Sequence, residues 1–479
     1  MSAYIKYAKI GAKVLGASTL VGALSIYTMS VPLIPPKNRK EKIVIVGGGT
    51  AGVGVAAMLR NRGMRNVTIV EPCNTHYYQP LWTLVGGGLK PVAASARPMA
   101  SVMPSGTNWI QTSVKDFYPE KNQVTTADGK TLEYDYLVVA AGMQTNWDAI
   151  PGLLEGLEKE DSGVVSVYSY KYADKTAKSL KAIQEKLKSD PKATATCIFT
   201  LSPTVIKCAG APQKIMWLFE DQLRSLGASV RDRADLGFWM PGSAMFGVKY
   251  YSDKLEEMRT KKNVGGLFSH VLTSIDVDKK LAIFVDKANN NSIVRQKFDL
   301  LHVAPHMSAP DFLKKSPLSD ADGWVDVDKH TLQSTKYENV FALGDCTNTP
   351  NSKTAAAITS QAPVLVHNME EHMDKKRKEA LDGSYSGYAS CPLVIGQKKV
   401  MLAEFGYGGQ IMETFGRETG RFPLKYFGTD GAVQYRFFYF LKEQLFPFVY
   451  WNLWTKGLWY GTNGPIKPDV RKSQVSSEK

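Results

Sequence analysis

Short runs of β-branched and apolar residues alternate along this chain with stretches whose apolar positions recur at helical spacing. The first run, residues 43–46, leads directly into a cluster of glycines and then into an apolar helical stretch over residues 53–60. A second run follows at residues 66–70, and similar strand-then-helix patterns recur at residues 193–201 and 339–343. Strands that alternate with helices are typical of parallel sheets covered by helices. The pattern predicts an α/β protein with two Rossmann-like domains.

The glycine cluster has the composition of a dinucleotide-binding turn. Gly47 permits the tight turn, Gly49 lets the backbone approach a pyrophosphate, and Gly52 allows the helix to pack closely on the strand. Thr50 and Ala51 open the following helix, whose N-terminus offers unpaired N–H donors to phosphate oxygens. We therefore expect a dinucleotide at this turn.

Three further features favour FAD as that dinucleotide. Glu71 ends the second apolar run, about 20 residues after the glycines, where an acid can hydrogen-bond the adenosine ribose. Residues 339–343 lead into Gly344-Asp345, and the run 134–142 ends in Gly142. Both segments resemble signatures of the flavoprotein reductases with two dinucleotide-binding domains. In those proteins a Gly-Asp at this place holds the ribityl chain of FAD.

The turn after the strand at residues 193–201 lacks the glycines that would hold NAD(P)H. Between that strand and the helix predicted to begin near Pro212, the chain carries Lys207 and Cys208. Without the glycine fingerprint a pyridine nucleotide would lack the cradle that holds its pyrophosphate. A cysteine at the place from which a hydride donor would act indicates a sulfur compound, and not NADH, as the electron source.

The five cysteines are too few for a disulfide-stapled secreted protein and lack the CxxC spacing of a zinc site, so we expect no bound metal. Cys208 has the setting of a reactive thiol, because Lys207 precedes it and a helix begins just after it. Cys391 lies on a predicted loop, and this context leaves open whether it is reactive or idle. The other three lie in a predicted strand core or near the adenosine and ribityl sites, and we interpret them as structural: Cys73, Cys197 and Cys346.

The charge is strongly basic and unevenly distributed. The 479 residues include 59 Lys and Arg against 45 Asp and Glu, a net charge of +14, which suits an anionic surface, an anionic substrate or a nucleic acid. Residues 1–13 combine lysines with apolar residues and resemble a mitochondrial presequence. Residues 14–36 are uncharged and just long enough for an anchor. The N-terminal segment is compatible with a cleaved presequence or with an uncleaved anchor or signal sequence.

Aromatic residues are concentrated near the C-terminus. Between Tyr435 and Tyr460, 12 of 26 residues are Phe, Tyr or Trp, against 10% in the whole chain. Pro447 is expected to divide the stretch into two helical pieces, each too short to span a bilayer. Aromatic, basic helices of this length lie in the membrane interface. We therefore expect peripheral membrane attachment through residues 435–460, with a buried aromatic core as the alternative.

Specific segments extend the resemblance to known proteins over nearly all of residues 41–460. They are residues 71–72, 76–80, 97–98, 205–214, 301–303, 323–328, 344–348, 352–357 and 390–394. Together with the glycine turn they resemble the sulfide:quinone oxidoreductases of mitochondrial type. The chain departs from that family at His306, where a proline is frequent, and over residues 230–243.

This resemblance implies which residues carry the chemistry. Cys208 and Cys391 would form the redox pair: sulfide attacks a sulfur bridge at Cys391, leaves a persulfide there and releases the Cys208 thiolate beside the flavin, which accepts two electrons. A small nucleophile, glutathione or sulfite, would take the sulfane sulfur, and ubiquinone would take the electrons near the C-terminal helices. Lys353 and Lys442 match family lysines that would favour anionic intermediates.

The resemblance also implies a cofactor site. FAD would bind non-covalently, because no cysteine lies between Cys73 and Cys197. The residues expected to bind it are Gly47, Gly49, Thr50, Ala51, Gly52, Glu71, Gln79, Val114, Gly142, Asp345 and Lys353.

The expected domain plan has four parts. They are a targeting segment and linker (1–40), an FAD domain (41–155 and 300–370), a degenerate second nucleotide-type domain (156–299), and a C-terminal region with membrane-facing helices (371–479). We expect the matrix face of the mitochondrial inner membrane as the location, and no nucleic-acid partner.

Two other functions fit parts of the sequence. A type II NADH:quinone oxidoreductase would share the FAD unit and the membrane-facing C-terminus, but the missing second glycine turn argues against it. A catalytically idle FAD-binding scaffold at the membrane is the other alternative. The presence of both Cys208 and Cys391 argues against that scaffold.

Overall fold

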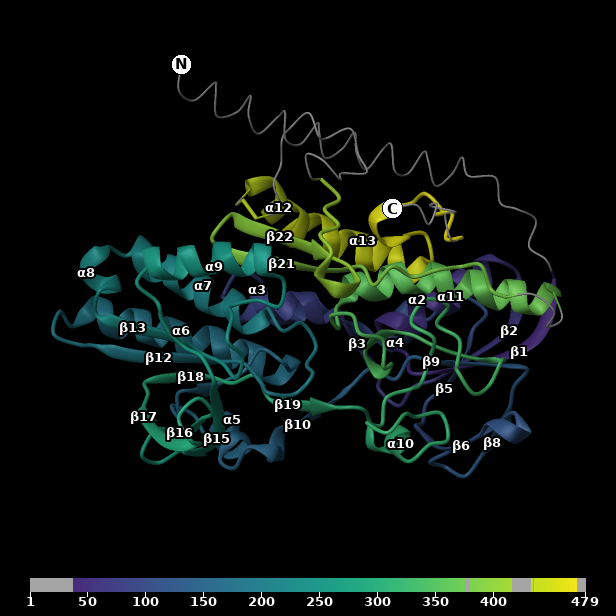
Figure 1. Ribbon diagram of the computed structural model, residues 1–479, viewed down its shortest axis with the longest axis horizontal. Coiled ribbons are helices and arrows are strands. Elements are labelled where there is room, and N and C mark those ends of the chain that lie inside the picture. Colours follow the sequence, from purple (N-terminus) through teal and green to yellow (C-terminus); the bar gives the residue numbers. More distant parts are fainter. Residues whose placement is uncertain (1–37, 376–379, 416–431, 434, 472–479) are drawn as a thin grey trace, which may run out of the picture.

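The computed structural model describes residues 38–375, 380–415, 432–433 and 435–471. Within these residues the chain forms two units of similar plan, which Figure 1 shows side by side, and a C-terminal layer that packs against both. Of the predicted targeting segment and linker, residues 1–40, residues 1–37 lie outside the described residues, and Arg39 and Lys40 already belong to the first strand.

A five-stranded parallel sheet forms the centre of the first unit, in the order β20-β9-β1-β2-β5. Its strands are β1 (Arg39–Val46), β2 (Met64–Val70), β5 (Asn108–Ile110), β9 (Tyr136–Val139) and β20 (Val340–Ala342). The elements that cover its two faces are helices α2 (Thr50–Asn61) and α11 (Ala355–Lys375) on one side and the antiparallel strands β6 (Val114–Tyr118), β7 (Gln123–Thr126) and β8 (Thr131–Glu133) on the other. Because both faces are covered, residues 43–46 of β1 are apolar and buried.

The second unit repeats this plan with a sheet in the order β11-β18-β12-β13-β14. Its strands are β11 (Val164–Val165), β12 (Ala195–Thr200), β13 (Ala234–Trp239), β14 (Gly265–Leu267) and β18 (Leu300–His302). The elements packed on it are helices α6 (Tyr170–Ser189), α7 (Ala211–Ser225) and α9 (Lys249–Lys261) and strands β15 (His270–Asp276), β16 (Leu281–Asp286) and β17 (Ser292–Lys297). The α/β fold with two Rossmann-like units is thus confirmed. Since β18 pairs in this sheet, the return to the first unit that we placed at residue 300 begins only after residue 302.

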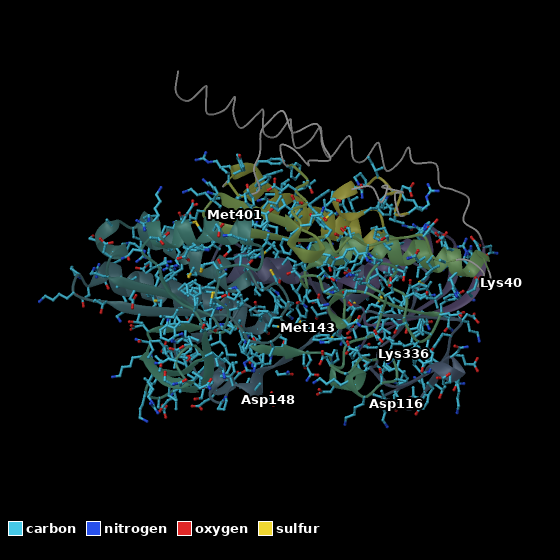
Figure 2. All side chains as sticks on the ribbon, viewed as in Figure 1. Lys40, Asp116, Met143, Asp148, Lys336 and Met401 are labelled. Atoms are coloured by element: carbon cyan, nitrogen blue, oxygen red, sulfur yellow. The ribbon has the colours of Figure 1, made fainter. Side chains whose placement is uncertain are left out.

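A short ribbon connects the two units. β10 (Gln144–Asn146) pairs antiparallel with β19 (His306–Ser308), and Figure 1 shows this ribbon between the sheets. Met143, just before β10, packs against the core of the second unit and lies near the middle of the molecule in Figure 2. The remaining short elements are β3 (Thr75–Tyr77), which pairs with β4 (Ala96–Pro98), and helices α3 (Trp82–Gly86), α4 (Met99–Val102), α5 (Leu153–Glu158), α8 (Ala228–Arg231) and α10 (Asp311–Lys314).

The C-terminal layer consists of a hairpin and a helical segment. β21 (Ala389–Gly396) pairs with β22 (Lys399–Phe405), and β21 packs on α7. Helix α12 (Arg436–Phe440), a π-helical turn (Leu441–Leu445) and α13 (Phe446–Asn452) follow without interruption.

Pro447 therefore does not divide this stretch as we expected, because it lies in the first turn of α13, where its missing N–H is tolerated. Among the helices that the structure describes, none is long and apolar enough to cross a membrane.

The aromatic side chains of this helical segment divide between two environments. Tyr450 and Trp454 are buried in the core of the first unit, so the buried-core interpretation holds for part of the stretch. Phe437, Phe440 and Phe448 are 45%, 42% and 38% exposed. The segment thus anchors itself in the protein by one set of rings and presents another set outward.

Candidate active site

The glycine turn between β1 and α2 has the geometry of a dinucleotide cradle. Gly47 has a φ of +103°, and a Cβ there would lie 2.5 Å from the carbonyl oxygen of Ala140. A Cβ on Gly52 would lie 1.8 Å from the oxygen of Gly47, so both positions require glycine. Gly49 is exposed at the N-cap of α2 and has no side-chain cap, which leaves the N–H groups of the first turn, including those of Thr50 and Ala51, open to an anion.

Glu71 follows β2 at the edge of this cradle. Its Oε2 accepts a hydrogen bond of 2.7 Å from the Gly48 N–H, and its Oε1 accepts one of 2.8 Å from the Cys73 N–H. A carboxylate retains further lone pairs for the hydroxyl groups of a ribose. Partial burial and the Glu71 carboxylate raise the pKa of Cys73 to about 11, so this thiol is not activated.

Asp345 lies beyond β20 in a 3-10 turn, Gly344–Cys346, at the carboxyl edge of the same sheet. Gly344 has a φ of +79°, and its N–H donates to Gln361 Oε1 at 2.9 Å, which fixes the turn. Burial raises the pKa of Asp345, while the ammonium groups of Lys353 and Lys207 oppose that rise. The half-buried carboxylate is therefore flanked by two cations.

The remaining residues predicted to bind the cofactor differ in their exposure. Gly142 has a φ of +67° just after β9, with no atom within 4 Å of a Cβ placed there, so its backbone is open to a ligand. Gln79 is exposed at the start of a 3-10 turn, Gln79–Leu81. Val114 begins β6 with its side chain buried in the core beneath the sheet. Lys353 is buried, and its Nζ donates to the carbonyl oxygens of Thr347 and Thr349 at 2.7 and 2.9 Å.

The two candidate redox cysteines meet at the contact between the second unit and the C-terminal hairpin. Cys208 lies in the loop before α7, and its Sγ is 3.9 Å from the Sγ of Cys391. Both thiols are free. Cys391 lies within β21 and not on a loop, which corrects our expectation; β21 packing on α7 brings it to Cys208. This cysteine pair is the centre of the site.

Gly210 makes that approach possible. A Cβ at this position would lie 2.5 Å from the Sγ of Cys391 and 2.9 Å from Leu393 Cδ2, so any larger residue would push β21 away from the loop. Sequence reasoning missed this residue. Its importance comes from a contact across the fold, which no spacing along the chain reveals.

Charge is divided unequally between the two sulfurs. Lys214, in the first turns of α7, is buried and places its Nζ 3.1 Å from Cys208 Sγ. The hydrogen bond from Cys391 and the nearby Lys214 ammonium hold the pKa of Cys208 well below its usual value. The same hydrogen bond to Cys208, together with burial, raises the pKa of Cys391. These pKa directions favour a thiolate on Cys208 and a thiol on Cys391.

The backbone of Cys208 adopts an uncommon conformation that its neighbours fix. Its φ of +50° lies in the left-handed region, which non-glycine residues seldom occupy. The Cys208 N–H donates to the Lys353 carbonyl oxygen at 2.8 Å, and the Cys208 oxygen accepts from the Tyr168 hydroxyl at 3.2 Å and the Ala211 N–H at 2.8 Å. Lys353 thus contacts this cysteine through its backbone. Tyr168, which the sequence did not single out, is a second positioning group.

A further cation near the pair comes from the C-terminal segment. Lys442, in the π-helical turn, is buried, and its Nζ donates to the Pro80 carbonyl oxygen at 2.7 Å. Burial and the Lys214 ammonium lower the pKa of Lys442 to about 7, while the two cysteines act in the opposite direction. Lys442 is therefore a cation whose charge changes near neutral pH.

The remaining cysteines are unsuited to redox chemistry. Cys197 is buried within β12, and burial raises its pKa. Cys346 is also buried, its Sγ donates to the carbonyl oxygens of Val139 and Leu343, and burial raises its pKa to about 11. Both residues fill the core, as we predicted for them.

Comparison with known proteins agrees with this site. Residues 41–183 match the pyridine nucleotide-disulphide oxidoreductase family, which implies a bound flavin. The mitochondrial sulfide:quinone oxidoreductase of Dictyostelium discoideum is 44% identical over 438 residues, 90% of this chain and 90% of that protein. Its counterpart from Mus musculus is 42% identical over 428 residues, 89% of this chain and 88% of the relative.

A solved structure shows the same fold. The sulfide:quinone oxidoreductase of Aquifex aeolicus superimposes with a TM-score of 0.63 at 18% identity, over 76% of this chain and 84% of that one. The fold, the flavin cradle and the extended identity to the two mitochondrial enzymes agree with one another. This chain therefore belongs to the sulfide:quinone oxidoreductase family of mitochondrial type, whose members are flavin-dependent oxidoreductases.

Proposed function

We propose that this protein oxidises hydrogen sulfide at the Cys208–Cys391 pair, beside non-covalently bound FAD, and passes the electrons to ubiquinone. One observation carries the proposal: the sulfurs of half-buried Cys208 and buried Cys391 lie 3.9 Å apart, with the Lys214 ammonium 3.1 Å from Cys208. The residues Gly47, Gly52, Glu71 and Asp345 would hold FAD, which supplies a two-electron acceptor when bound. The same groups support FAD over a mononucleotide, because the cradle and Glu71 suit a diphosphate and an adenosine ribose.

The unequal charge on the pair supports a direction for sulfide attack. In the oxidised enzyme a bridge joins the two sulfurs, and hydrosulfide attacks the sulfur of Cys391, so that a persulfide forms there and the S–S bond to Cys208 breaks. Cys208 is the better leaving group, because Lys214 stabilises its thiolate. When an acceptor has taken the sulfane sulfur from Cys391, the bond between the two cysteine sulfurs re-forms as two electrons pass to the flavin that would be bound beside them and the Cys391 proton leaves.

The cations near the pair support an anionic sulfur acceptor. Sulfite and glutathione both carry negative charge, and Lys207, Lys214 and Lys442 lie around the cysteines or the neighbouring Asp345. We propose either compound as the acceptor. Lys353, beside Asp345, would favour negative charge on the reduced flavin.

The helical segment of the C-terminal layer supports a membrane-bound acceptor. Lys442 is buried and interacts electrostatically with Cys208 and Cys391, whereas Phe440 and Phe448 of the same segment are exposed. A membrane in contact with the exposed rings would bring ubiquinone to the layer that covers the cysteines. Because the two relatives are mitochondrial enzymes, we propose peripheral attachment at the matrix face of the inner membrane.

The test is sulfide-dependent reduction of ubiquinone by the purified protein and by single cysteine variants. Cys208→Ser and Cys391→Ser should each lose turnover by at least about 100-fold while keeping FAD, because the bridge needs both sulfurs. Cys391→Ser should retain a thiolate-to-flavin absorbance band that Cys208→Ser lacks. Cys73→Ser is the matched control and should retain activity.

The alternative NADH oxidation is tested in the same cuvette. If NADH reduced the flavin faster than sulfide did, or if Cys208→Ser kept full sulfide-dependent flavin reduction, the proposed function would be wrong.

A further inference from the structure

The end of the C-terminal segment packs directly on the helix that follows the glycine turn. Trp454 is 1% exposed, and its indole N–H donates to the carbonyl oxygen of Thr50, the first residue of α2, at 2.9 Å. A Cβ on Gly54 would lie 2.1 Å from the Trp454 ring, and a Cβ on Gly457 would lie 2.7 Å from the backbone nitrogen of Met58. Two glycines thus permit a close fit between this segment and α2.

A chain of hydrogen bonds continues from this contact into the turn itself. The Tyr450 hydroxyl lies 2.8 Å from Thr50 Oγ1 and 2.6 Å from His76 Nε2, and His76 Nδ1 lies 3.0 Å from the Gly48 carbonyl oxygen. All of the connecting groups are buried or half-buried. This series of hydrogen bonds therefore joins α13 to both Gly48 and Thr50 of the glycine turn.

Protonation fixes the direction of this chain. Burial lowers the pKa of His76 to about 4, so the imidazole is neutral near pH 7. Because the Gly48 carbonyl can only accept, the proton is on Nδ1, and Nε2 accepts from the Tyr450 hydroxyl. The Tyr450 oxygen then accepts from the Thr50 hydroxyl. Every polar atom in this series of hydrogen bonds has a partner. Loss of the Tyr450 hydroxyl would leave Thr50 Oγ1 and His76 Nε2 without that partner.

We propose that Tyr450 is a positioning residue of the FAD site, and that docking of residues 446–457 and binding of FAD stabilise each other. The inference rests on the proposed binding of FAD at the glycine turn. The N–H groups of that turn hold a diphosphate only while Gly48 and Thr50 keep their positions. Tyr450 links both residues to α13, and coupling between two binding events is reciprocal. The segment that faces the membrane therefore also holds the cofactor loop.

The experiment uses the FAD-loaded enzyme and the variant Tyr450→Phe, which removes the hydroxyl and keeps the ring packed on Tyr78, 4.2 Å away between centroids. Release of FAD on dilution, followed by the rise of flavin fluorescence, should be about tenfold faster than in the wild type, as expected for the loss of a buried hydrogen bond. Tyr439→Phe is the matched control, because Tyr439 is a buried tyrosine of α12, in the same C-terminal layer but outside this series of hydrogen bonds.

Hydrogen exchange of the same FAD-loaded proteins separates positioning from simple packing. In Tyr450→Phe, exchange should rise together in peptides covering the glycine turn and residues 446–457, whereas a packing defect would raise it only in the second peptide. FAD release within twofold of the wild type, or a rise confined to residues 446–457, would overturn the inference. A wild-type protein that carries no FAD would instead contradict the proposed function.

Discussion

Buried lysines from distant parts of the chain set the charge at the cysteine pair. Lys214 comes from α7 in the second unit and contacts the Cys208 sulfur, whereas Lys442 comes from the C-terminal segment and contacts a backbone carbonyl. Burial alone would lower the pKa of Lys214. The negative charge on the nearby cysteine pair outweighs this effect, so the pKa of Lys214 lies above its usual value. Among the described residues, none gives Lys442 a direct anionic contact of this kind, and its pKa of about 7 reflects the cost of burying its charge.

Because the charge of Lys442 is costly to bury, the free energy of unfolding should rise with pH. In the unfolded chain Lys442 titrates near its ordinary pKa of 10.5, and in the folded protein near 7, so the unfolded state binds more protons between these values. The burial cost is present in full below about pH 7 and is relieved as the pH rises. The free energy of unfolding of the wild type minus that of Lys442→Met should therefore rise by up to about 1.4 kcal/mol per pH unit above pH 7.

Urea denaturation of both proteins at several pH values measures this difference. The contributions of titrating groups remote from Lys442 cancel in the subtraction. Lys214, Cys208 and Cys391 interact with the Lys442 charge, so the difference reports Lys442 together with this coupling. A difference that stays constant from neutral to alkaline pH would contradict the shifted pKa of Lys442.

Among the secondary-structure elements, the contact between α7 and β21 decides the geometry of the site. Gly210→Ala would place a methyl carbon 2.5 Å from Cys391 Sγ and force the strand and the loop apart. We expect sulfide-dependent flavin reduction to fall by about 100-fold, as a displacement near 1 Å can cause, with FAD still bound. Stopped-flow absorbance measures the rate. Gly242→Ala, at a glycine after β13 of the same unit with no atom within 4 Å of its Cβ, should keep the wild-type rate. Equal rates in both variants would count against this role of Gly210.

The helical segment 436–452 combines attachment to the protein with an exposed aromatic surface. Complete truncation at residue 435 would remove Tyr450 and Trp454 from the core as well as the exposed rings, so it cannot isolate membrane binding. Substituting only exposed residues avoids this difficulty, because their side chains contribute little to the core.

The triple variant Phe437→Ser, Phe440→Ser and Phe448→Ser should weaken binding to lipid vesicles by about 100-fold, because each ring loses about 1 kcal/mol of burial in the interface. Co-sedimentation with vesicles measures binding. Reduction of a soluble quinone analogue should be retained, whereas reduction of ubiquinone in vesicles should fall. Ile293→Ser, which alters an exposed apolar residue of β17, is the control. Unchanged vesicle binding in the triple variant would exclude this surface as the membrane contact.

For the molecule as a whole, we expect net charge and the apolar surface to make separable contributions to the proposed membrane binding. The charge of +14, less the +6 of residues 1–40, leaves +8 on a chain that begins at Glu41. Ionic attraction to anionic lipids is screened by salt, whereas insertion of aromatic rings is not. Raising the salt from about 0.1 M to about 1 M should therefore weaken binding of this chain to anionic vesicles and leave its binding to neutral vesicles almost unchanged. Vesicle binding that does not respond to salt on anionic lipid would show that the net charge plays no part.

The sequence by itself determined the parts of this protein that local physics controls. The glycine turn, Glu71 and Asp345 could be proposed as the FAD site from the sequence, because each requirement is local. A backbone without side chains and an acid after a strand are both met by residues close together in the chain. Cys208 could be proposed as a reactive thiol from local features as well, because Lys207 precedes it and a helix begins just after it. The two-unit α/β fold followed from the alternation of apolar runs.

Only the tertiary structure decided how distant segments meet. Context along the chain left Cys391 undecided and placed it on a loop, whereas β21 packs on α7 and brings its sulfur to Cys208. Gly210 and Tyr168 act across the interface between elements, so no local pattern marks them. The aromatic C-terminus could be assigned to a membrane or to a core from composition alone. In the fold its rings divide, because hydrophobic burial depends on which residues a helix turns toward its neighbours, and not on how many aromatic residues it contains.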